Sequence, residues 1–378
     1  MNIIHFTLGS VNPSSSNGVN RVIEGLSKYC NKSSDVNTIV LTLSKKQKHH
    51  IKKYVRDGFE VTSFKSIFKL VSFFRKNSNT IDIVHFHTVF SITNIIVFYF
   101  LYKNNIKAIV SPHSGFSINR LKNSNFILKK IFNKFIQRYY LDKLDGIHCA
   151  AHEEMIDVPK FTNNKNLFVV KNGIDFENLE KKTKNLKKIK KSKIHIGLVG
   201  RIKNEKNIHG FLKGISLLND EISEKIRFII IGEIKKDSYG KNIIRLKNNL
   251  KLNSNVDFLG EKYGEELWEI LNSLDIYIQP SLDEGGASIS IMEAMFFKLP
   301  IIATHECKVT DIKDKSFIKL IGTNPKDIAN GLNESIENLE EFKKEGLEAH
   351  KYIKENRSWE SIAKKMIIEY KSIIKDSD

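Results

Sequence analysis

The stretch IYIQPSLDEGGASISIMEAMFFKLPIIAT, residues 276–304, decides the fold class. It begins with a short apolar strand pattern, passes through a loop with two adjacent glycines, and ends in a second apolar strand pattern, PIIAT. Between the two lies a helical segment in which Glu293 has apolar neighbours on both sides. Short strands that are apolar throughout are typical of a parallel sheet with helices on both faces. This strand–helix–strand unit therefore predicts an α/β fold.

The same alternation continues along the whole chain. A lysine-rich segment, EKKTKNLKKIKKSK at residues 180–193, interrupts it and indicates a solvated linker or loop, because it offers little to bury. We therefore predict two Rossmann-like, doubly wound parallel-sheet domains, at residues 1–178 and 194–355, that face each other across a cleft. The expected strands are NIIHFT, NTIVLTL, FEVTSF, IDIVHFHT, KAIVSPH, DGIHCAA and LFVVKNG before the lysine-rich segment, and IHIGLVG, RFIIIGE, VDFLG, IYIQPS and PIIATH after it.

Composition supports globular domains and excludes several classes of protein. The 378 residues are 41% hydrophobic and 28% charged, which excludes a disordered or collagen-like chain. The longest apolar run, Ile95–Tyr102, has eight residues, whereas a membrane-spanning helix needs about 20. The start, MNIIHFTLGS, lacks the basic and apolar regions of a secretory signal, and Cys30, Cys149 and Cys307 lie far apart in the sequence. We therefore expect neither disulfides nor a cysteine zinc site, and a cytoplasmic location.

Positive charge is concentrated in the first half of the chain. The formal net charge is +18, and residues 1–175 carry 25 basic and 11 acidic side chains, against 36 and 32 in the remainder. Such a field indicates an anionic partner: nucleic acid, acidic lipid headgroups or a phosphorylated substrate. Nucleic acid is disfavoured, because the sequence has neither a recognisable reading helix nor aromatic residues interleaved with basic ones on an exposed sheet.

Two basic segments have apolar residues at helical spacing. One is SFKSIFKLVSFFRKN at residues 63–77, and the other is INRLKNSNFILKKIFNKFIQRYY at residues 118–140, which contains no acidic residue. Helices of this kind can lie on anionic membrane surfaces, here the inner face of the cell membrane. The alternative is that the apolar stripes pack onto the protein's own sheet and the lysines are merely solvated. The second stripe comprises Leu128, Ile131, Phe132, Phe135, Ile136 and Tyr139.

Polar residues follow three of the expected strands in the first half. The loop LGSVNPSSSNGVNRVIEGL, residues 8–26, is rich in Gly, Ser and Asn and enters a helix near Gly18, where backbone N–H groups favour an anion. His85 and His87 end one strand and His113 follows the next, at the sheet edge where α/β proteins bind ligands. The alternatives are an ordinary turn for the loop and structural roles for the histidines.

The second half has two candidate binding loops. Arg201 and Lys206 lie in the loop that leaves a central strand, and a rigid guanidinium together with a mobile ammonium suits a diphosphate. In the opening stretch, Glu284 precedes the glycine pair and Glu293 lies about one turn into the following helix. A carboxylate among apolar neighbours needs hydroxyl or N–H partners. A ribose diol would supply them, and a helix-capping role is the alternative.

In their order along the chain, these residues resemble the retaining glycosyltransferases of family four. Members of that family have the GT-B fold of two facing Rossmann-like domains, and the resemblance covers essentially the whole chain. Its most specific part is a pair of glutamates around a glycine-containing loop ahead of an EAM helix. The matching segments are the Gly18 loop, DIVHFH (82–87), SPHSG (111–115), VVKNGID (169–175), VGRIKNEKN (199–207), RFIIIGE (227–233), VDFLG (256–260) and SLDEGGASISIMEAM (281–295) with LPIIAT (299–304).

The resemblance implies a role for each candidate residue. The N-terminal domain, completed by a final helix at about 358–378, would bind the acceptor, and the C-terminal domain would bind the nucleotide sugar. Arg201 and Lys206 would bind the donor's diphosphate, Glu293 the ribose hydroxyls, Glu284 a hydroxyl of the transferred sugar, and His113 would lie beside that sugar. The implied catalytic set is His113, Glu284, Arg201 and Lys206; the donor set is Gly18, Arg201, Lys206, Glu284, Gly285, Gly286, Ala287 and Glu293; the acceptor set is Asn17, His85 and His87.

The chain departs from the family pattern at two positions. Glu284 and Glu293 are nine positions apart, one more than is usual in the family, and Gly285 stands where the first glutamate is expected. Either the loop bulges by one residue or backbone groups replace the carboxylate. Ser114 follows His113, where the family often has glycine.

The resemblance also implies a metal-independent transferase that retains the configuration of the sugar. We expect no metal or cofactor, because fixed cations and helix-start N–H groups would stabilise the leaving diphosphate, and the only Asp-x-Asp, Asp376-Ser-Asp378, is at the chain end. The expected donor is a UDP-sugar and then GDP-mannose, and the acceptor is a glycan or lipid-linked molecule in surface polysaccharide synthesis. The alternatives are a nucleotide-sugar epimerase or hydrolase without an acceptor, and a non-catalytic protein that binds nucleotide sugars or nucleic acid.

Overall fold

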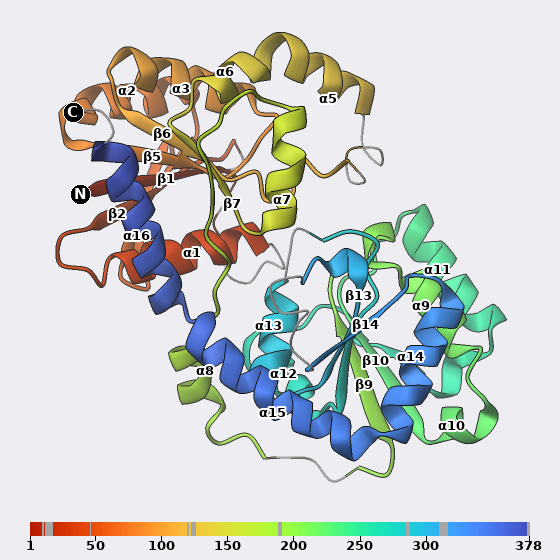
Figure 1. The fold of residues 1–378 in the computed structure, drawn as a ribbon. Helices are drawn as coiled ribbons and strands as arrows, with labels where there is room; N and C mark the ends of the chain where they lie inside the picture. Colours follow the sequence, from red (N-terminus) through yellow and green to blue (C-terminus); the bar gives the residue numbers. More distant parts are fainter. Residues whose placement is uncertain are drawn as a thin grey trace. The chain divides into compact units, whose positions relative to one another are not determined.

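The chain folds into two compact units, each built on its own sheet (Figure 1). Unit 1 comprises Met1–Gly173 with Trp359–Asp378, and unit 2 comprises Ile174–Ser358. Both sheets are mostly parallel and covered by helices, which confirms the predicted fold class. The structure is a computed structural model that describes residues 1–9, 11, 18–45, 47–118, 121, 126–187, 191–284, 288–309 and 317–375.

The described part of unit 1 contains an eight-stranded sheet in the order β3-β4-β2-β1-β5-β6-β7-β8. Strand β1 lies near its centre and pairs in parallel with both β2 and β5. The strands are β1 (Asn2–Leu8), β2 (Asn37–Leu43), β3 (Ile51–Arg56), β4 (Phe59–Phe64), β5 (Ile83–Phe86), β6 (Lys107–Val110), β7 (Gly146–Cys149) and β8 (Leu167–Val169). The helices are α1 (Gly18–Cys30), α2 (Ile67–Asn77), α3 (Ile92–Lys103), α5 (Phe126–Phe132), α6 (Arg138–Asp142), α7 (His152–Asp157) and α16 (Trp359–Lys375), with the short 3₁₀ helices η1 (Ser78–Thr80) and η3 (Val158–Lys160) and the π-helix η2 (Asn133–Gln137).

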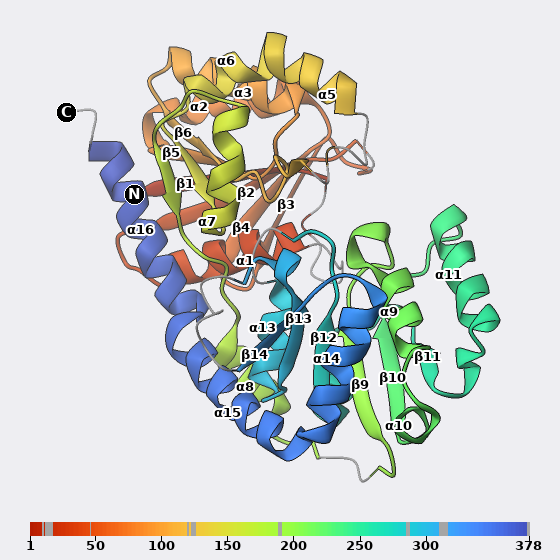
Figure 2. The same ribbon diagram turned by 45° about the vertical axis from the view of Figure 1, so that its right-hand side comes forward.

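Alternate residues of the central strands point to opposite faces of this sheet, and each face has its own helices. Ile4 and Phe6 of β1 pack with α2, α3 and α6 on one face. Ile3 of β1 and Ile83 of β5 pack with α1 and α16 on the other. The two groups of helices therefore lie on opposite sides of the sheet (Figure 2). Strands apolar on both faces explain why the sequence pattern was nearly continuous rather than alternating.

Strand β3 was not expected from the sequence. Its residues, IKKYVR, are mostly exposed and include two lysines, so the apolar pattern of a buried strand is missing. It runs antiparallel to β4 at the edge of the sheet, and the two strands are joined by Asp57 and Gly58. Both turn residues have positive φ, 44° and 87°, as two-residue hairpin turns require. Lysines on an exposed edge strand also oppose pairing with another chain.

The described part of unit 2 contains a six-stranded parallel sheet in the order β11-β10-β9-β12-β13-β14. The chain order reverses between β9 and β12, and ligands of such sheets bind beyond the carboxyl ends of the strands at this switch point. The strands are β9 (Ile194–Val199), β10 (Ile226–Ile231), β11 (Val256–Phe258), β12 (Ile276–Gln279), β13 (Ile301–Thr304) and β14 (Ile318–Ile321), of which β14 was not predicted. The helices are α8 (Phe176–Thr183), α9 (Ile208–Ile215), α10 (Asp220–Glu224), α11 (Ser238–Asn249), α12 (Gly264–Ser273), α13 (Ile289–Phe296), α14 (Pro325–Glu337) and α15 (Leu339–Asn356), with short turns η4 (Asn204–Lys206), η5 (Leu252–Ser254) and η6 (His305–Cys307).

The predicted linker is partly helical. Residues 181–183 form the end of α8, whose Phe176 and Leu179 are buried in the core of unit 2 against α12 and α13. The lysine-rich segment does not predict this helix, because the buried side chains, Phe176 and Leu179, precede the lysines. Residues 188–190 lie outside the described residues.

The three cysteines are buried free thiols, Cys30 and Cys149 in unit 1 and Cys307 in unit 2. Burial raises the pKa of Cys30 to about 12. Burial, and then the nearby Glu284 carboxylate, raises the pKa of Cys307 to about 12. All three thiols are therefore protonated near neutral pH.

The apolar stripe of the second basic segment does not pack against the sheet, contrary to the alternative stated for it. Most of this stripe points to solvent, with Phe135 72% exposed, whereas Phe132 is partly buried near the ring of Phe90. The buried positions include two polar side chains as well as Leu121 and Tyr140. Asn133 and Gln137 hydrogen-bond to each other, Asn133 donates to the carbonyl of Phe161, and the backbone N–H of Phe90 donates to Gln137. The exposed apolar residues of α5, η2 and α6 are Ile127, Leu128, Ile131, Phe135, Ile136 and Tyr139.

The first basic segment packs mainly inward, as the alternative for it predicts. Phe64, Leu70 and Phe74 are buried in the core of unit 1, whereas Phe68 is 82% exposed. The neighbouring α3 adds Ile92, Ile96, Tyr99 and Tyr102 to the exposed apolar residues. Helices α2, α3 and α6 adjoin one another on one side of the sheet (Figure 1). We call the exposed residues of α2, α3, α5, η2 and α6 the apolar face.

Gly25 of α1 is required by the packing of α16. A Cβ atom at this position would lie 2.1 Å from the indole ring of Trp359, so no larger residue fits without moving the ring. We expect Gly25→Ala to lower the free energy of unfolding by about 1–3 kcal/mol through overpacking. Gly18→Ala is the matched control, because a Cβ there meets nothing within 4 Å. Equal thermal stability of the two variants would contradict this packing.

Candidate functional site

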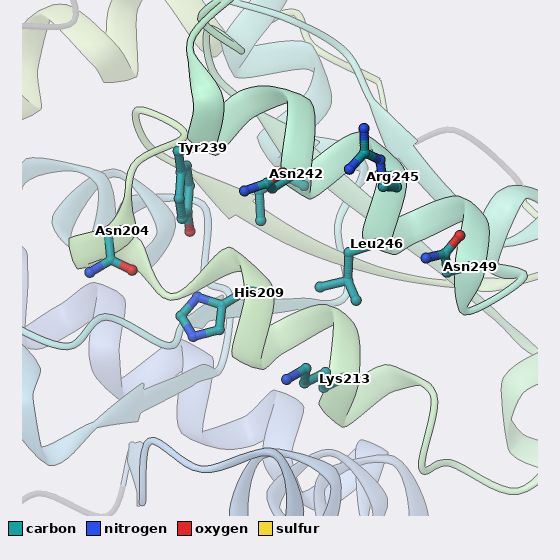
Figure 3. A pocket seen from close by; sticks show the side chains of 9 residues that line it. Asn204, His209, Lys213, Tyr239, Asn242, Arg245, Leu246 and Asn249 are labelled. Atoms are coloured by element: carbon teal, nitrogen blue, oxygen red, sulfur yellow. The ribbon is translucent and has the colours of Figure 1, made fainter.

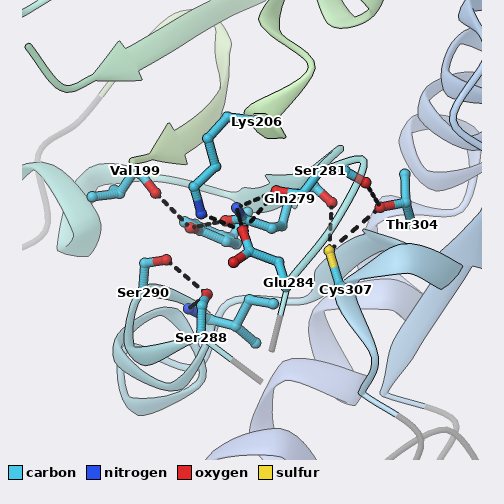
Figure 4. A network of polar contacts seen from close by, with 11 residues as sticks. Val199, Lys206, Gln279, Ser281, Glu284, Ser288, Ser290, Thr304 and Cys307 are labelled. Carbon is cyan, nitrogen blue, oxygen red and sulfur yellow. Dashed lines mark hydrogen bonds and ion pairs between the residues drawn. The ribbon is translucent and has the colours of Figure 1, made fainter. Parts of the chain in front are cut away.

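Loops at the carboxyl ends of β9 and β12 bring Lys206 and Glu284 together at the switch point of the unit 2 sheet. Lys206 Nζ and Glu284 Oε1 form an ion pair, and both side chains are largely buried (Figure 4). Ser281 Oγ donates to the same carboxylate oxygen at 2.8 Å, and Gln279 Nε2 donates to it at 3.2 Å. Lys206 and Glu284, two predicted site residues that are 78 positions apart in the sequence, are thus in direct contact.

The Tyr277 hydroxyl orients the side-chain amide of Gln279. The Tyr277 hydroxyl donates to Gln279 Oε1 at 2.7 Å, so the amide NH₂ of Gln279 must face Ser281 and Glu284 (Figure 4). Burial raises the pKa of Tyr277, which keeps this hydroxyl a donor. This network supplies the Glu284 carboxylate with hydrogen-bond donors from Ser281 and Gln279.

Side chains from β13 and η6 fix the backbone of the same loop. Thr304 Oγ1 donates to the carbonyl of Ser281 at 2.6 Å, and Cys307 Sγ donates to the carbonyl of Gln279 at 3.2 Å. The backbone N–H of Glu284 donates to the carbonyl of Glu306 at 3.0 Å. These contacts hold the chain after β12 in one conformation up to Glu284.

Asp283, the neighbour of Glu284, has a structural partner. Its carboxylate accepts from Lys308 Nζ at 2.8 Å, and Asp283 is almost fully buried. The adjacent backbone N–H of Leu282 donates to the carbonyl of Glu205, which joins this loop to the one that carries Lys206. The two loops of the site therefore support each other through backbone as well as side-chain contacts.

Arg201 differs from the other charged residues of the site. It lies two positions after the end of β9, is exposed, and makes no hydrogen bond or ion pair with any described residue. The strand ends beside it are tightly packed, since a Cβ on Gly232 would lie 1.9 Å from the carbonyl oxygen of Gly200. The Lys206 side chain lies over Gly200, 3.3 Å from where a Cβ would be. The two predicted cations, Arg201 and Lys206, thus both lie next to Gly200. Lys206 is paired with Glu284, whereas Arg201 has no partner among the described residues.

Glu293 is buried in the middle of α13, as the sequence suggests. It takes part in at least one hydrogen bond, ion pair or electrostatic interaction. Ser288 caps this helix, because its Oγ accepts from the N–H of Ile291 at 3.3 Å. Capping by Ser288 removes the need for Glu293 to cap the helix. Gly285, Gly286 and Ala287, three predicted donor-binding residues, lie outside the described residues.

In unit 1, the predicted histidines belong to a buried cluster on the α16 side of the sheet. His5 of β1, His85 and His87 at the end of β5, and His148 of β7 are buried, and His113 after β6 is partly buried. Burial, and then the neighbouring histidines, lowers the pKa of His5 and His113 to about 3 and that of His85 and His87 well below the usual value. All of these rings are neutral at pH 7.

The expected contact of His85 and His87 with an acceptor is not supported by their burial. Neither ring has exposed surface, and their nitrogens are used within the protein. His113 is the ring that reaches the edge of the cluster, where His87 Nδ1 lies 3.0 Å from its Nε2. Gly18 is exposed at the first position of α1, and Asn17 lies outside the described residues.

The backbone around His113 has an unusual conformation. His113 and Ser114 have φ of 49° and 62°, both in the left-handed region that glycine favours. This explains why the family often has glycine where Ser114 stands. The buried Glu154 of α7 stabilises the turn, because its carboxylate accepts from the N–H groups of Ser114 and Ala150. Glu154 could not be recognised from the sequence, because one of its partners, the N–H of Ser114, lies 40 positions away.

One group of side chains has the composition of a metal site. Within the described residues, His5, His85 and His87 each place one ring nitrogen within 4.8 Å of the others. His85 already uses both nitrogens, with the Tyr370 hydroxyl at 2.7 Å and Ser111 Oγ at 2.6 Å. A metal ion would have to break these contacts, so the arrangement fits a hydrogen-bonded cluster better than a metal centre.

A separate cavity of about 430 Å³ lies between α9 and α11 (Figure 3). It is lined by His209 and Lys213 of α9 and by Tyr239 and Arg245 of α11. None of the residues predicted for the site lines this cavity.

The comparisons with known proteins agree with this architecture. Residues 16–178 match the family described as Glycosyltransferase Family 4, and residues 179–359 match the family described as Glycosyl transferases group 1. Anabaena HepE, solved in complex with UDP and glucose, has the same fold, with a TM-score of 0.73 at 14% identity over 98% of this chain and 100% of that one. The two doubly wound units and this structural likeness show the GT-B fold. The chain belongs to the family-four glycosyltransferases.

Two relatives are similar in sequence. An uncharacterized glycosyltransferase of Methanocaldococcus jannaschii is 29% identical over 65% of this chain and 62% of its own length. CapH of Staphylococcus aureus, a capsular polysaccharide biosynthesis glycosyltransferase, is 26% identical over 68% of this chain and 70% of its own length. Within the described residues, no helix is both long and apolar enough to cross a membrane.

The different surroundings of Lys206 and Arg201 predict different effects on stability. Lys206→Ala leaves the buried Glu284 carboxylate without its cation, and we expect the free energy of unfolding to fall by about 2–3 kcal/mol. Arg201→Ala removes the same charge from an exposed position and should change stability by less than about 0.5 kcal/mol. Denaturant unfolding of both variants measures this difference. A Lys206→Ala variant as stable as Arg201→Ala would contradict a structural role for the ion pair.

Proposed function

We propose that the chain transfers a sugar from a nucleoside-diphosphate donor, a UDP-sugar rather than GDP-mannose, to a glycan or lipid-linked acceptor. The main support is Arg201, an exposed cation without a partner among the described residues, beside Lys206 at the switch point of the unit 2 sheet. A guanidinium and an ammonium at this position suit the two phosphates of a diphosphate. The fold shared with HepE, solved with UDP and glucose, favours uridine.

The Lys206–Glu284 ion pair is the resting state of the donor site in this proposal. The arriving diphosphate takes Lys206 from Glu284, and the freed carboxylate oxygen accepts a hydrogen bond from a hydroxyl of the transferred sugar. Ser281 and Gln279 keep donating to the carboxylate during the exchange, so Glu284 never becomes an unpaired buried charge. Glu293 binds the ribose hydroxyls.

The bond to the diphosphate breaks with help from fixed charges in this proposal. Negative charge develops on the leaving diphosphate, and Arg201 and Lys206 stabilise it in positions set before the reaction begins. Loss of one such group costs on the order of 3 kcal/mol in barrier height, or about a hundredfold in rate. These cations take the place of a metal ion, and the acceptor attacks from the face that the diphosphate leaves, which retains the sugar's configuration.

Arg201→Ala provides the sharpest test of the donor site. We expect this variant to bind UDP-glucose at least about tenfold more weakly by calorimetry, because a charge-assisted contact is lost while stability is unchanged. Arg245→Ala, an exposed arginine of α11, is the matched control and should bind as the unmodified protein does. GDP-mannose and ADP-glucose complete the panel.

Three outcomes would contradict the proposal. Unchanged affinity of Arg201→Ala for UDP-glucose would refute the diphosphate assignment. Loss of transfer in excess EDTA would refute metal independence. Turnover of UDP-glucose at an equal rate without any acceptor would identify a hydrolase or epimerase instead.

The apolar face supports a lipid-linked acceptor at the inner surface of the cell membrane. Its exposed side chains lie among Lys129, Lys130, Lys134 and Arg138, and α2, α3, α5 and η2 contain no acidic residue. Apolar side chains that insert into the headgroup region and lysines that contact anionic lipids are the two components of interfacial binding. The relationship to CapH, named for capsular polysaccharide biosynthesis, is consistent with such an acceptor.

Vesicle sedimentation tests the membrane contact. We expect Leu128→Asp with Phe135→Asp to weaken binding to vesicles with anionic lipid by more than about tenfold, because two inserted side chains are lost. Leu347→Asp, which alters an exposed leucine of α15 in unit 2, is the control and should bind normally. Binding should also fall with added salt. Normal binding of the double variant would exclude the apolar face as the membrane contact.

A further inference from the structure

Two hydrogen-bond chains run through the histidine cluster of unit 1. A neutral imidazole has one N–H donor and one acceptor nitrogen, so each contact in such a chain limits the next. The first chain joins His5, His87 and His113, with ring nitrogens 2.9 and 3.0 Å apart. The second joins His148, Ser111, His85 and Tyr370. The position of each proton can therefore be derived from groups at the chain ends.

The second chain has only one consistent arrangement of protons. His148 Nε2 lies 2.7 Å from the carbonyl of Val170, which only accepts, so Nε2 carries the proton. His148 Nδ1 must then accept from Ser111 Oγ at 2.7 Å. Ser111 has no further proton and accepts from His85 Nε2, which leaves His85 Nδ1 to accept from the Tyr370 hydroxyl. Both histidines of this chain are therefore protonated on Nε2.

The first chain has two arrangements, and His5 distinguishes them. His5 Nε2 is buried and has no hydrogen-bond partner among the described residues. If that nitrogen carried a proton, the chain would bury an unpaired N–H group, which folded proteins avoid more strictly than an unpaired acceptor. The proton of His5 therefore belongs on Nδ1, which donates to His87 Nε2. His87 must then donate from Nδ1 to His113 Nε2.

We infer that His113 carries its proton on Nδ1, and that His87 and His5 are positioning residues that set this tautomer. His113 Nδ1 makes no hydrogen bond to any described residue. With this proton, His113 offers a hydrogen-bond donor to a ligand oxygen and does not act as a base. The role toward a sugar or phosphate oxygen rests on the proposed function, whereas the tautomer does not. The Glu154 contact to the N–H of Ser114 holds the left-handed backbone beside this ring, and the ring itself stacks on His87.

Nitrogen-15 NMR of the unmodified protein with labelled histidine tests the tautomer without any ligand. We expect His5, His87 and His113 to show a protonated Nδ1 and an unprotonated Nε2. His85 and His148 should show the opposite pattern in the same spectrum. A protonated Nε2 on neutral His113 would overturn the inference, whatever the outcome of the UDP-glucose experiments.

A matched pair of variants at His87 tests its positioning role. His87→Asn retains an amide that can donate to His113 Nε2, whereas His87→Asp has nearly the same shape but an ionised carboxylate only accepts. We expect Nε2 of His113 to stay unprotonated in His87→Asn and to become protonated in His87→Asp. The affinity for UDP-glucose should stay within about threefold in the first and fall at least about tenfold in the second.

Tyr370→Phe provides the control within the cluster. It removes the hydroxyl that donates to His85 and leaves the first chain intact, so thermal stability should fall while the His113 signals stay unchanged. Identical His113 protonation in His87→Asn and His87→Asp would overturn the role of His87. If the His87→Asp variant does not fold, the spectrum of the unmodified protein still decides the tautomer.

Discussion

The need to neutralise the buried Glu284 carboxylate organises the strand ends of unit 2. Lys206 supplies the charge, and Ser281 and Gln279 supply hydrogen bonds to the same oxygen. Gln279 can donate to Glu284 because the Tyr277 hydroxyl donates to its amide oxygen and so fixes the orientation of the amide. A carboxylate removed from water costs several kcal/mol unless such partners are present. The loops after β9 and β12 are thus held together by the same interaction that leaves a charged pair at the edge of the sheet.

Unit 1 also buries polar side chains that need hydrogen-bonding partners, but these side chains are uncharged. Parallel strands at the centre of a sheet normally bury apolar side chains on both faces, but here His5, His85 and His148 replace them beneath α16. Four buried neutral imidazoles and a partly buried fifth can pack together only if donors and acceptors alternate along each chain of hydrogen bonds. Tyr370 of α16 belongs to this system, so the C-terminal helix contributes hydrogen bonding as well as apolar packing.

The sequence predicted the elements whose pattern is local and missed those that depend on pairing. Apolar runs identified all the central strands, and the family match confirms the resemblance. Strand β3 escaped because an exposed edge strand needs no apolar run. Lys206 and Glu284 were predicted as site residues, but their contact depends on strand order, which sequence spacing does not reveal. Gln279, Glu154 and His5 could not be recognised, because their importance lies in hydrogen bonds that no spacing pattern reveals. The segment at 126–140 shows the limit of periodicity: it located the stripe but not the direction in which the stripe faces.

The positions of the three cysteines make the two units separately observable. Cys30 and Cys149 lie in the core of unit 1 and Cys307 lies under the loop of Glu284 in unit 2, all buried. A protonated, inaccessible thiol reacts with an alkylating reagent only when its surroundings open, so the rate of labelling measures local unfolding. Peptide mapping of alkylated protein would therefore time the opening of each half of the molecule by itself, without any engineered probe.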